Sequence, residues 1–446
     1  MRINLPSPSK FKDLLNEITF SKVENPITGV TLDSREAKPG DLFIALVGNK
    51  VDGHNYLFEA SQKNCAAALV SKPNNSIKIQ QISVDDPAIT ITEIGKKWRS
   101  LQSVEVIGIT GSNGKTTTKE LLLHIFSAWH LVHGTRGNYN THLGLPLTLL
   151  ELDSQHTQSF LEMGANHRGD IDHLCNLSLP RHGLITNIAP SHLSSFGSIE
   201  TIAKTKGELF EFLPKNGIAF VNNDDNAIGK IETDAEKVSF GFSSDCDFFG
   251  NIKLDNDGLI TLSINGEDIP TRSANKIFAK NVFAASVIAS TMGISWEGIK
   301  NQIKCFQGVK SRCELIKKNG ITIIDDSYNA NLTSSLAALD YLLNISSAGK
   351  KHFVFGDMLE LGVSSKDHHR KIGVAASNNG VDCLYCYGYE SSITAKAANG
   401  IESHHFKDKT SLLKLLRKNL NIGDTVLFKG SRGMSLESII KELVKV

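Results

Sequence analysis

Apolar residues alternate along the chain between short β-like runs and longer stretches with helical spacing. The clearest run is VEVIGIT at 104–110, where β-branched and apolar residues follow one another over the length of a strand. Continuous runs of this kind are typical of strands buried on both faces. A glycine-containing loop follows, and TTTKELLLHIFSAWH at 116–130 then repeats apolar residues at helical spacing. The pattern therefore predicts a strand, a glycine loop and a helix in succession.

The same alternation divides the chain into three blocks. The first block ends in a helix predicted over 87–102. The second contains helices predicted over 200–213 and 277–293, with a β-rich polar segment at 236–272 that we expect at a sheet edge. The strands that we expect are 40–48 and 65–72 in the first block, 159–165, 182–189 and 217–224 in the second, and 320–328, 351–358, 381–388 and 424–432 in the third.

Strands that alternate with helices favour parallel sheets with crossover helices. A chain of 446 residues is also too long for one ordinary hydrophobic core. We therefore predict an α/β protein of three domains. These are a small α/β domain at 1–103, a central parallel-sheet domain with the glycine loop at 104–308, and a doubly wound, Rossmann-like domain at 309–446.

Composition narrows the class of protein. Lys and Arg number 48 and Asp and Glu 47, so the chain lacks the basic excess of a nucleic-acid-binding protein. No apolar stretch has the length of a membrane span, and the first residues lack a signal-peptide core. The seven cysteines show no paired metal-type spacing, and we interpret Cys383 and Cys386 as residues of a strand. We expect a cytoplasmic monomer with reduced thiols.

The segment GITGSNGKTTTKE at 108–120 is a candidate phosphate-binding loop, although two residues separate Gly111 from Gly114 where the standard pattern has four. Small residues let backbone N–H groups turn inward, Lys115 can reach terminal phosphates, and the Thr116 hydroxyl suits Mg²⁺. A tight turn with an incidental lysine is the alternative. The position between a buried strand and a helix N-terminus favours phosphate binding. The predicted loop contacts are Gly111, Ser112, Asn113, Gly114, Lys115, Thr116 and Thr117.

TGSNGKT resembles the compact loop of the Mur ligase family, the ATP-dependent amide ligases of cell-wall precursor synthesis. Similar stretches occur in family order before the loop, at 31–54, and after it, at 137–150, 161–171, 185–198, 203–210, 323–331, 355–362 and 427–434. DDSYNAN and GDMLELG are similar to the branch that joins D-alanyl-D-alanine to a UDP-N-acetylmuramoyl-tripeptide through an acyl phosphate. The DNPR motif, which would suggest the ligase that acts one step earlier, does not occur in the sequence.

The resemblance implies two Mg²⁺ ions beside ATP. Glu162 and His192 follow predicted strands, where ligands gather in parallel sheets, and His192 completes an N-x-A-x-x-H spacing. The resemblance also implies that Lys206 is carbamylated, which would convert a cation into a metal-binding anion. Lys204 lies two residues away and points elsewhere on the helix. The implied metal ligands are Thr116, Glu162, His192 and Lys206, and the implied catalytic residues are Lys115, Glu162, His192 and Lys206.

The resemblance implies further contacts at positions that match the family. For ATP they are Asn281, Arg312 and Asp357, and for the UDP substrate Ser34, Arg35, Asn140 and Thr141. For the acceptor dipeptide they are Asp326, Tyr328, Asn329, Asn331, Lys429, Ser431 and Arg432. One of the acids Asp325 and Asp326 is also expected to cap a helix. The chain departs from the family at Lys280 and Ala284, where His and Asn are common, and at Ser311, where Gly is usual.

Two other functions compete with this interpretation. A folylpolyglutamate-type ligase would act on another carboxylate, but such ligases lack the uridine-nucleotide block that 31–54 resembles. A P-loop switch or motor would hydrolyse ATP without ligation, and it gives no reason for the DDSYNAN and GDMLELG stretches.

Overall fold

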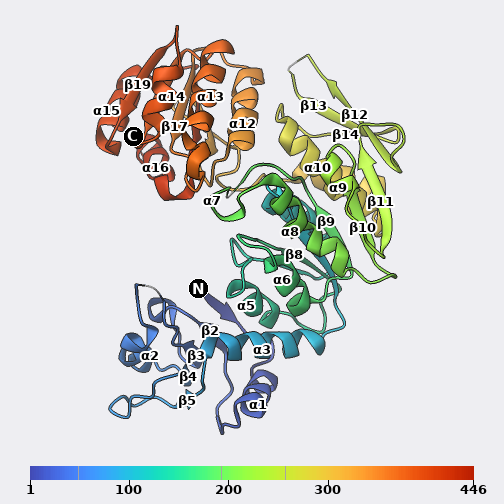
Figure 1. Cartoon of the computed structure of the whole chain (residues 1–446), viewed down its shortest axis with the longest axis vertical. Coiled ribbons are helices and arrows are strands. Elements are labelled where there is room, and N and C mark those ends of the chain that lie inside the picture. The colour runs from blue at the N-terminus through green and yellow to red at the C-terminus, as the bar shows by residue number, and fades with distance from the viewer. Residues whose placement is uncertain (49, 192, 257, 446) are drawn as a thin grey trace.

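The described residues form three β-sheets that follow one another along the chain (Figure 1). The computed structural model describes residues 1–48, 50–191, 193–256 and 258–445. Helices and strands alternate through most of the chain, as the hydrophobic pattern predicted. The α/β fold of three domains is thereby confirmed, and the boundaries near 103 and 308 stay predictions.

The first sheet has the strand order β1-β2-β3-β4-β5, in which β1 pairs antiparallel with β2 and the later pairs are parallel. Its strands are β1 (Arg2–Asn4), β2 (Gly29–Thr31), β3 (Asp41–Ile44), β4 (Ala67–Val70) and β5 (Gln81–Ser83). Its helices are α1 (Pro8–Thr19), η1 (Ser34–Glu36), η2 (Gly53–Tyr56), α2 (Leu57–Gln62) and α3 (Pro87–Ser100).

Helix α3 joins the first domain to the central one. It begins at Pro87, and the Asp86 carboxylate caps it by accepting the N–H groups of the next turn. Near its end, the Trp98 indole donates a hydrogen bond of 3.1 Å to the Leu152 carbonyl. Buried residues of the first sheet, of α3 and of the central helices form one hydrophobic cluster. The two domains therefore share a core.

The central sheet has the order β14-β13-β12-β11-β10-β9-β6-β8-β7. Its pairs are parallel from β7 to β12, and β12, β13 and β14 are antiparallel at the edge, which confirms the predicted excursion at 236–272. Its strands are β6 (Glu105–Thr110), β7 (Val132–Gly134), β8 (Gln158–Glu162), β9 (His182–Ile185), β10 (Ile218–Asn222), β11 (Glu236–Gly241), β12 (Phe248–Leu254), β13 (Ile260–Ile264) and β14 (Glu267–Pro270). Its helices are α4 (Lys115–Phe126), α5 (Gly144–Leu150), α6 (Asp170–Ser178), α7 (Leu193–Phe196), α8 (Ile199–Phe212), α9 (Asn226–Gly229), α10 (Lys276–Thr291) and α11 (Trp296–Cys305).

The C-terminal sheet has the order β15-β16-β20-β17-β18-β19, with β15 antiparallel and the others parallel. Its strands are β15 (Glu314–Lys318), β16 (Ile321–Asp326), β17 (Lys351–Gly356), β18 (Cys383–Tyr387), β19 (Glu402–Phe406) and β20 (Thr425–Lys429). Its helices are α12 (Leu332–Asn344), η3 (Gly362–Ser364), α13 (Ser365–Asn378), α14 (Ser391–Ala397), α15 (Lys409–Asn419), η4 (Arg432–Met434) and α16 (Glu437–Val444). Cys383 and Cys386 both lie in β18 and pack into different clusters, which confirms them as strand residues.

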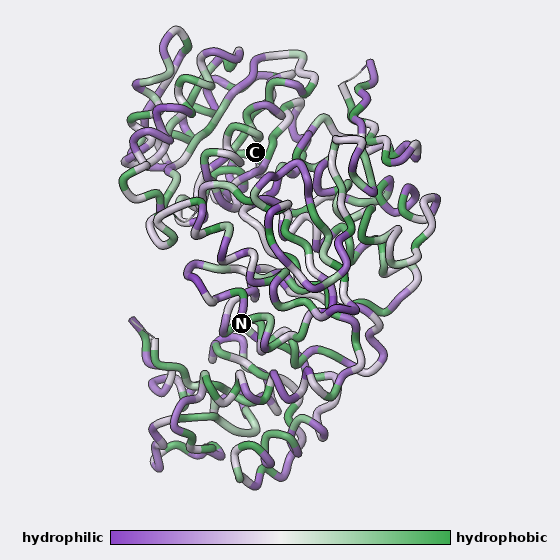
Figure 2. The backbone as a smooth tube through the Cα atoms, turned by 45° about the vertical axis from the view of Figure 1, so that its right-hand side comes forward, coloured by the Kyte–Doolittle hydropathy of each residue, from purple (hydrophilic) through white to green (hydrophobic). Residues whose placement is uncertain are grey.

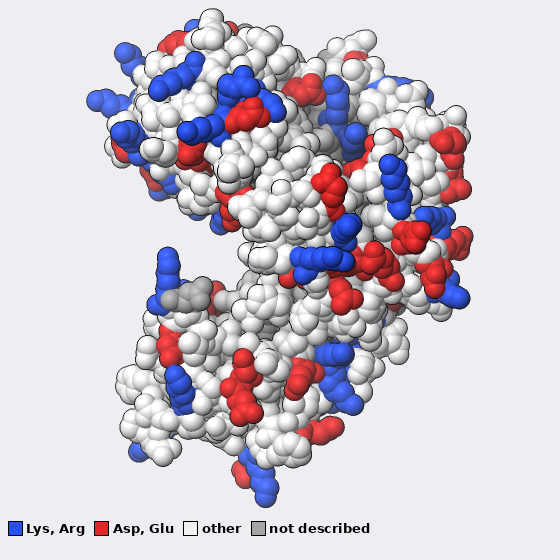
Figure 3. All heavy atoms as spheres, viewed as in Figure 1, with Lys and Arg blue, Asp and Glu red and all other residues white. Residues whose placement is uncertain are grey.

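Hydropathy and charge are distributed over all three domains. Figure 2 shows short hydrophobic segments spread over all three parts of the chain. None of the described helices is long and apolar enough to cross a membrane. Figure 3 shows acidic and basic side chains interspersed on the viewed face, and a broad hollow between the N-terminal and C-terminal domains.

Candidate active site

A cavity of about 630 Å³ lies between the central and C-terminal domains. On the central side it is lined by the loop 111–118 and by residues that follow the carboxyl ends of β8, β9 and β10. On the other side it is lined by residues that follow β16 and β20 of the C-terminal sheet. Carboxyl ends of parallel strands are where ligands bind in such sheets, and here the ends of two sheets face one cavity.

The loop after β6 needs glycine at two positions. Gly111 has φ +143° and Gly114 has φ +85°, values that other residues adopt only with strain. A β-carbon on Gly111 would lie 1.9 Å from the Thr186 Oγ1, and one on Gly114 would lie 2.4 Å from the Asn281 Oδ1. The short loop is therefore closed tightly against its neighbours.

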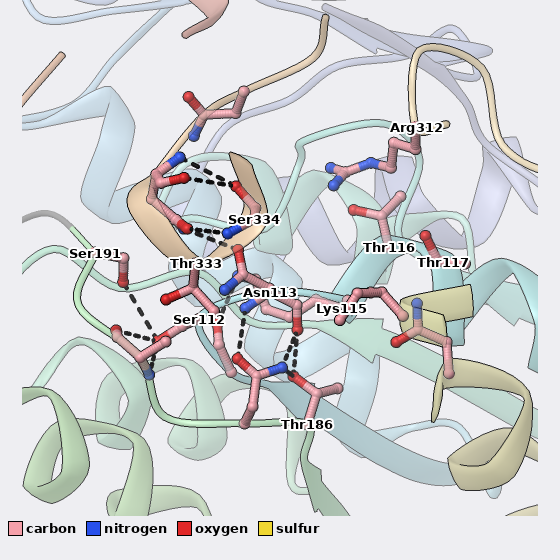
Figure 4. A pocket seen from close by; sticks show the side chains of 18 of the residues that line it. Ser112, Asn113, Lys115, Thr116, Thr117, Thr186, Ser191, Arg312, Thr333 and Ser334 are labelled. Carbon is pink, nitrogen blue, oxygen red and sulfur yellow. Dashed lines mark hydrogen bonds between the residues drawn. The ribbon is translucent and has the colours of Figure 1, made fainter. Parts of the chain in front are cut away.

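Asn187 fixes the shape of this loop from the end of β9. Its carbonyl accepts the Ser112 N–H at 2.9 Å, its Oδ1 accepts the Asn113 N–H at 3.1 Å, and its amide donates to the Asn113 carbonyl at 2.8 Å. The Ser112 hydroxyl donates to the Ala189 carbonyl at 2.8 Å (Figure 4). These bonds explain why the strand predicted to reach 189 ends at Ile185.

The first turn of α4 presents the predicted phosphate ligands. Lys115 donates a hydrogen bond of 2.7 Å to the Gly111 carbonyl, and burial lowers the pKa of its ammonium. The Thr116 hydroxyl and the Asn140 amide each donate to the Glu162 carboxylate at 2.7 Å. The first N–H groups of a helix have no intrahelical partners and attract anions. The structure thus brings together all the predicted loop residues with Glu162, Asn140 and Thr141 around one cavity.

Two lysines on α8 differ sharply in environment. Lys206 is 3% exposed and lines the cavity, whereas Lys204 is exposed. Burial, and then the nearby charge of Lys115, hold the pKa of Lys206 well below its usual value. This difference confirms that the two side chains point in different directions. His192, the other expected metal ligand from the central domain, lies outside the described residues.

The residues of the C-terminal domain that we expect to bind the acceptor dipeptide line the opposite wall of the cavity. Lys429 is buried and contacts the Asp326 carboxylate and the Asn329 carbonyl, each at 2.7 Å. The Tyr328 ring lies 4.1 Å from the Arg312 guanidinium and 5.8 Å from that of Arg432. Figure 4 shows Arg312 directed toward the start of α4. Positive groups of both domains therefore face the same space.

Asn331 connects the two walls. Its amide donates a hydrogen bond of 2.8 Å to the Asn113 Oδ1 in the phosphate loop. Its Oδ1 accepts the Ser334 N–H at 2.8 Å and so caps α12. The expectation that Asp325 or Asp326 caps a helix is wrong for α12. Asp325 instead accepts bonds from the Ser311 and Ser327 hydroxyls, and so fixes the loop after β16.

Three predicted residues lie away from the cavity lining. The Asp357 carboxylate accepts the N–H groups of Tyr389, Glu390 and Ser391 at the start of α14. Arg35 forms an ion pair of 2.6 Å with Asp33, lowering that carboxyl's pKa to about 2. The Ser34 hydroxyl donates to the Glu59 carboxylate at 2.7 Å. Asp357 therefore has a structural role, and its ribose contact stays a prediction.

The positions at and beside the departures from the family pattern have the following local surroundings. Ser311 has φ +58°, a left-handed conformation in which glycine is the usual residue. Asn281 accepts a weak hydrogen bond of 3.4 Å from the Thr118 hydroxyl and lines the cavity beside Gly114. Lys280 lies over the Phe242 ring at 5.9 Å.

The sequence interpretation missed two acids that line the cavity, Asp224 and Asp225. Asp225 accepts the Ile188 N–H at 2.7 Å and thereby holds the segment that follows β9. A signal was present, because the polar run NNDD at 222–225 directly follows the apolar residues of β10.

A tight phosphate loop that shares its cavity with a doubly wound domain defines a nucleotide-dependent enzyme of the P-loop class. Models of the "Mur ligase middle domain", the "Mur ligase, glutamate ligase domain" and the "Mur ligase family, catalytic domain" match residues 109–289, 311–432 and 26–113. The chain belongs to the Mur ligase family.

Individual relatives are similar to this chain over nearly its whole length. The UDP-N-acetylmuramoyl-tripeptide–D-alanyl-D-alanine ligase of Bacillus subtilis is 34% identical, with 94% of this chain and 93% of that protein covered. The ligase of the same name from Escherichia coli is 33% identical, with 98% and 97% covered. A crystal structure of MurF from Acinetobacter baumannii has a TM-score of 0.88 at 30% identity, covering both chains fully. MurF ligase from Thermotoga maritima, in complex with ADP, has a TM-score of 0.81 at 28% identity, covering 93% and 97%.

Proposed function

We propose that the chain is an ATP-dependent ligase that joins D-alanyl-D-alanine to the free carboxylate of UDP-N-acetylmuramoyl-tripeptide. The product is the UDP-linked pentapeptide precursor of peptidoglycan. Relatives that carry this activity in their names match more than nine-tenths of the chain, which supports the substrate pair. The similar ligase in complex with ADP supports the use of ATP.

One observation carries the proposal: the phosphate loop and the polar residues of the C-terminal domain face the same cavity. Forming an amide from a carboxylate requires that carboxylate, the nucleotide and the amine to meet in one place. The bond between Asn113 and Asn331 brings the nucleotide loop within hydrogen-bond distance of the expected acceptor region.

The chemistry follows from the groups in the cavity. A carboxylate is a poor electrophile, so it first takes the γ-phosphoryl group of ATP to form an acyl phosphate, and ADP leaves. The dipeptide amine then attacks the acyl carbon, forming the amide and releasing phosphate and a proton. Lys115 and the first turn of α4 stabilise negative charge on the transferred phosphoryl group. Arg312, Lys429 and Arg432 add positive charge from the C-terminal wall. Enclosure between two domains excludes water, which would hydrolyse the acyl phosphate.

The cavity also fits Mg²⁺. The Thr116 hydroxyl and the Glu162 carboxylate lie 2.7 Å apart, and such hard oxygen donors are the ligands that Mg²⁺ prefers. Bound Mg²⁺ would act as a Lewis acid for the phosphoryl group. We assign two ions, held by Thr116, Glu162, His192 and a modified Lys206.

Lys206 fits this set only after modification, since an ammonium group would repel a cation. Burial, and then the charge of Lys115, lower the pKa of Lys206, which makes it easier to form the neutral amine that attacks CO₂. The new N–C bond gives a carbamate and releases one proton. The carbamate offers two oxygens and a negative charge to the metal.

The remaining predicted contacts complete the proposal. Ser34 and Arg35 bind the UDP moiety, with the Arg35 guanidinium suited to bidentate phosphate contact. Asn140 and Thr141 orient the substrate near Glu162. Asp326, Tyr328, Asn329, Asn331, Lys429, Ser431 and Arg432 form the dipeptide region, and Asn281 and Asp357 contact adenosine.

Phosphate release measured with UDP-N-acetylmuramoyl-tripeptide, with and without D-alanyl-D-alanine, tests the function. Sustained release should require both substrates, and mass spectrometry should detect the pentapeptide. Release that is independent of any carboxylate substrate would identify a P-loop hydrolase instead. Activity with a folate or another acid, but not with the tripeptide, would identify a different ligase.

A further inference from the structure

A second cluster of metal-ligating side chains lies in the C-terminal domain. Cys383 begins β18, and its partner across the pair is Glu402, the first residue of the edge strand β19. His404 lies two residues further along β19 and therefore shares the face of Glu402. Each of these side chains offers a ligand atom within 4.8 Å of the other two.

This cluster is separate from the candidate active site. The cavity receives Asp326 and Lys429, the last residues of β16 and β20. Cys383 and Glu402 are the first residues of their strands, and all four strands run parallel. The cluster and the cavity therefore lie at opposite ends of the sheet.

The three side chains match the chemistry of zinc. A thiolate and a carboxylate supply two negative charges, which balance a divalent cation, and a neutral imidazole completes three ligands. Sulfur and nitrogen donors favour Zn²⁺, whereas Mg²⁺ prefers oxygen alone. A fourth, tetrahedral position stays open to water. The site would therefore bind Zn²⁺ in preference to Mg²⁺, the ion that we expect beside ATP.

Surrounding contacts orient these ligands. The His404 Nε2 lies 2.7 Å from the Glu402 Oε1, and the Tyr385 ring stacks on His404 with centroids 5.7 Å apart. The Asn419 amide in turn donates to the Tyr385 hydroxyl at 3.2 Å. Cys383 is 2% exposed, whereas the His404 and Glu402 side chains are 33% and 53% exposed. One ligand is thus anchored in the core, and the other two leave a path for the ion.

We propose that Cys383, Glu402 and His404 form a zinc-binding site that ties the edge strand β19 to β18. The bond that forms is between the metal and the thiolate sulfur, and the thiol proton passes to solvent. Burial raises the pKa of Cys383 to about 11, and Tyr385, Glu402, Lys350 and Asp382 act on it from neighbouring positions. Zinc binding must displace this proton, so affinity increases with pH.

Cobalt(II) is a suitable probe, because it occupies zinc sites and absorbs light when bound by a thiolate. Full-length protein carrying Cys305→Ser, which removes the exposed thiol, is freed of metal and titrated with Co²⁺ in excess Mg²⁺. We expect one equivalent to bind with a sulfur-to-cobalt charge-transfer band, and Zn²⁺ to abolish that band. A titration without the band overturns the proposal.

Matched variants locate the ligand. Cys383→Ser should remove the charge-transfer band, whereas Cys386→Ser, on the same strand and buried in a different cluster, should leave it. Glu402→Gln changes an exposed side chain, so the fold is kept. It should weaken Co²⁺ binding at least about tenfold, the loss seen even for outer partners of metal ligands. A band that survives Cys383→Ser, or unchanged affinity in Glu402→Gln, contradicts the site.

Discussion

The phosphate loop and the N-terminal segment that we assign to the UDP substrate are built in opposite ways. In the loop, backbone and side chains are fixed by Asn187, Glu162 and neighbouring strand ends, and Thr116 is buried, as is Lys206 of α8 in the same cavity. In the N-terminal segment, the Arg35 side chain is 83% exposed and contacts Asp33, two residues away. The loop is held in shape by contacts between distant segments, whereas the Arg35 side chain is exposed and paired with a neighbour in the chain. Residues of an organised, buried site should therefore matter more for the chemical step.

Lys115→Ala should have the largest effect and provides the strongest test of this comparison. Loss of an ammonium that stabilises the transferred phosphoryl group should reduce turnover on the order of a hundredfold or more. Ligation is measured as phosphate release, and circular dichroism during heating serves as the control for folding. A variant within a few-fold of the parent would falsify the assignment of the loop as the ATP site.

Lys206→Ala should be nearly as severe, because it removes the carbamate that we assign to a metal. Acetate or formate should partly restore activity by entering the space left behind, and rescue should increase with carboxylate concentration but not with chloride at equal ionic strength. Lys204→Ala is the matched control on the exposed face of α8, with a mild effect and no rescue. Nearly full activity in Lys206→Ala would leave the second metal site without this ligand.

Asn331→Ala should have an intermediate effect, since it removes the bond to Asn113 and the cap of α12 together. Cap loss alone should lower the free energy of unfolding by about 1 kcal/mol. We expect the KM for D-alanyl-D-alanine to increase about tenfold, the order lost with one or two hydrogen bonds.

Asn331→Asp separates the two roles, because it keeps the capping oxygen and loses the donor to Asn113. It should restore thermal stability while the KM for the dipeptide stays high. If acyl-phosphate formation failed while dipeptide affinity stayed normal, Asn331 would belong to the ATP side of the cavity.

Arg35→Ala should have the smallest effect on turnover. It tests the exposed N-terminal segment against the buried phosphate loop. Loss of a charged hydrogen-bond donor should weaken binding of the UDP substrate on the order of tenfold and leave ATP affinity unchanged. Part of the loss should appear in turnover, because binding energy of remote groups also contributes there. Unchanged affinity for the nucleotide sugar in a calorimetric titration would require another role for this segment.

The hydrophobic pattern and the motifs predicted most of the residues that line the cavity. They did not predict the contacts between segments that are distant in the sequence. The loop residues 111–117 could be found because strand, glycine turn and helix are adjacent in the chain. Asp357 was expected at a ribose on the grounds of its position after a strand. In the structure its carboxylate holds the start of α14, some thirty residues later, a contact that the local sequence does not reveal. The ribose contact stays a prediction.

The sequence by itself determined the α/β class, the three sheets, the edge excursion at 236–272 and the family, because these depend on local periodicity and on motifs of contiguous residues. Tertiary structure decided which distant groups meet. The burial that lowers the pKa of Lys206, the bond between Asn113 and Asn331, and the approach of Cys383, Glu402 and His404 all join segments that the chain order separates. Solvent exclusion and distance between side chains are properties of the packed molecule, so no local pattern encodes them.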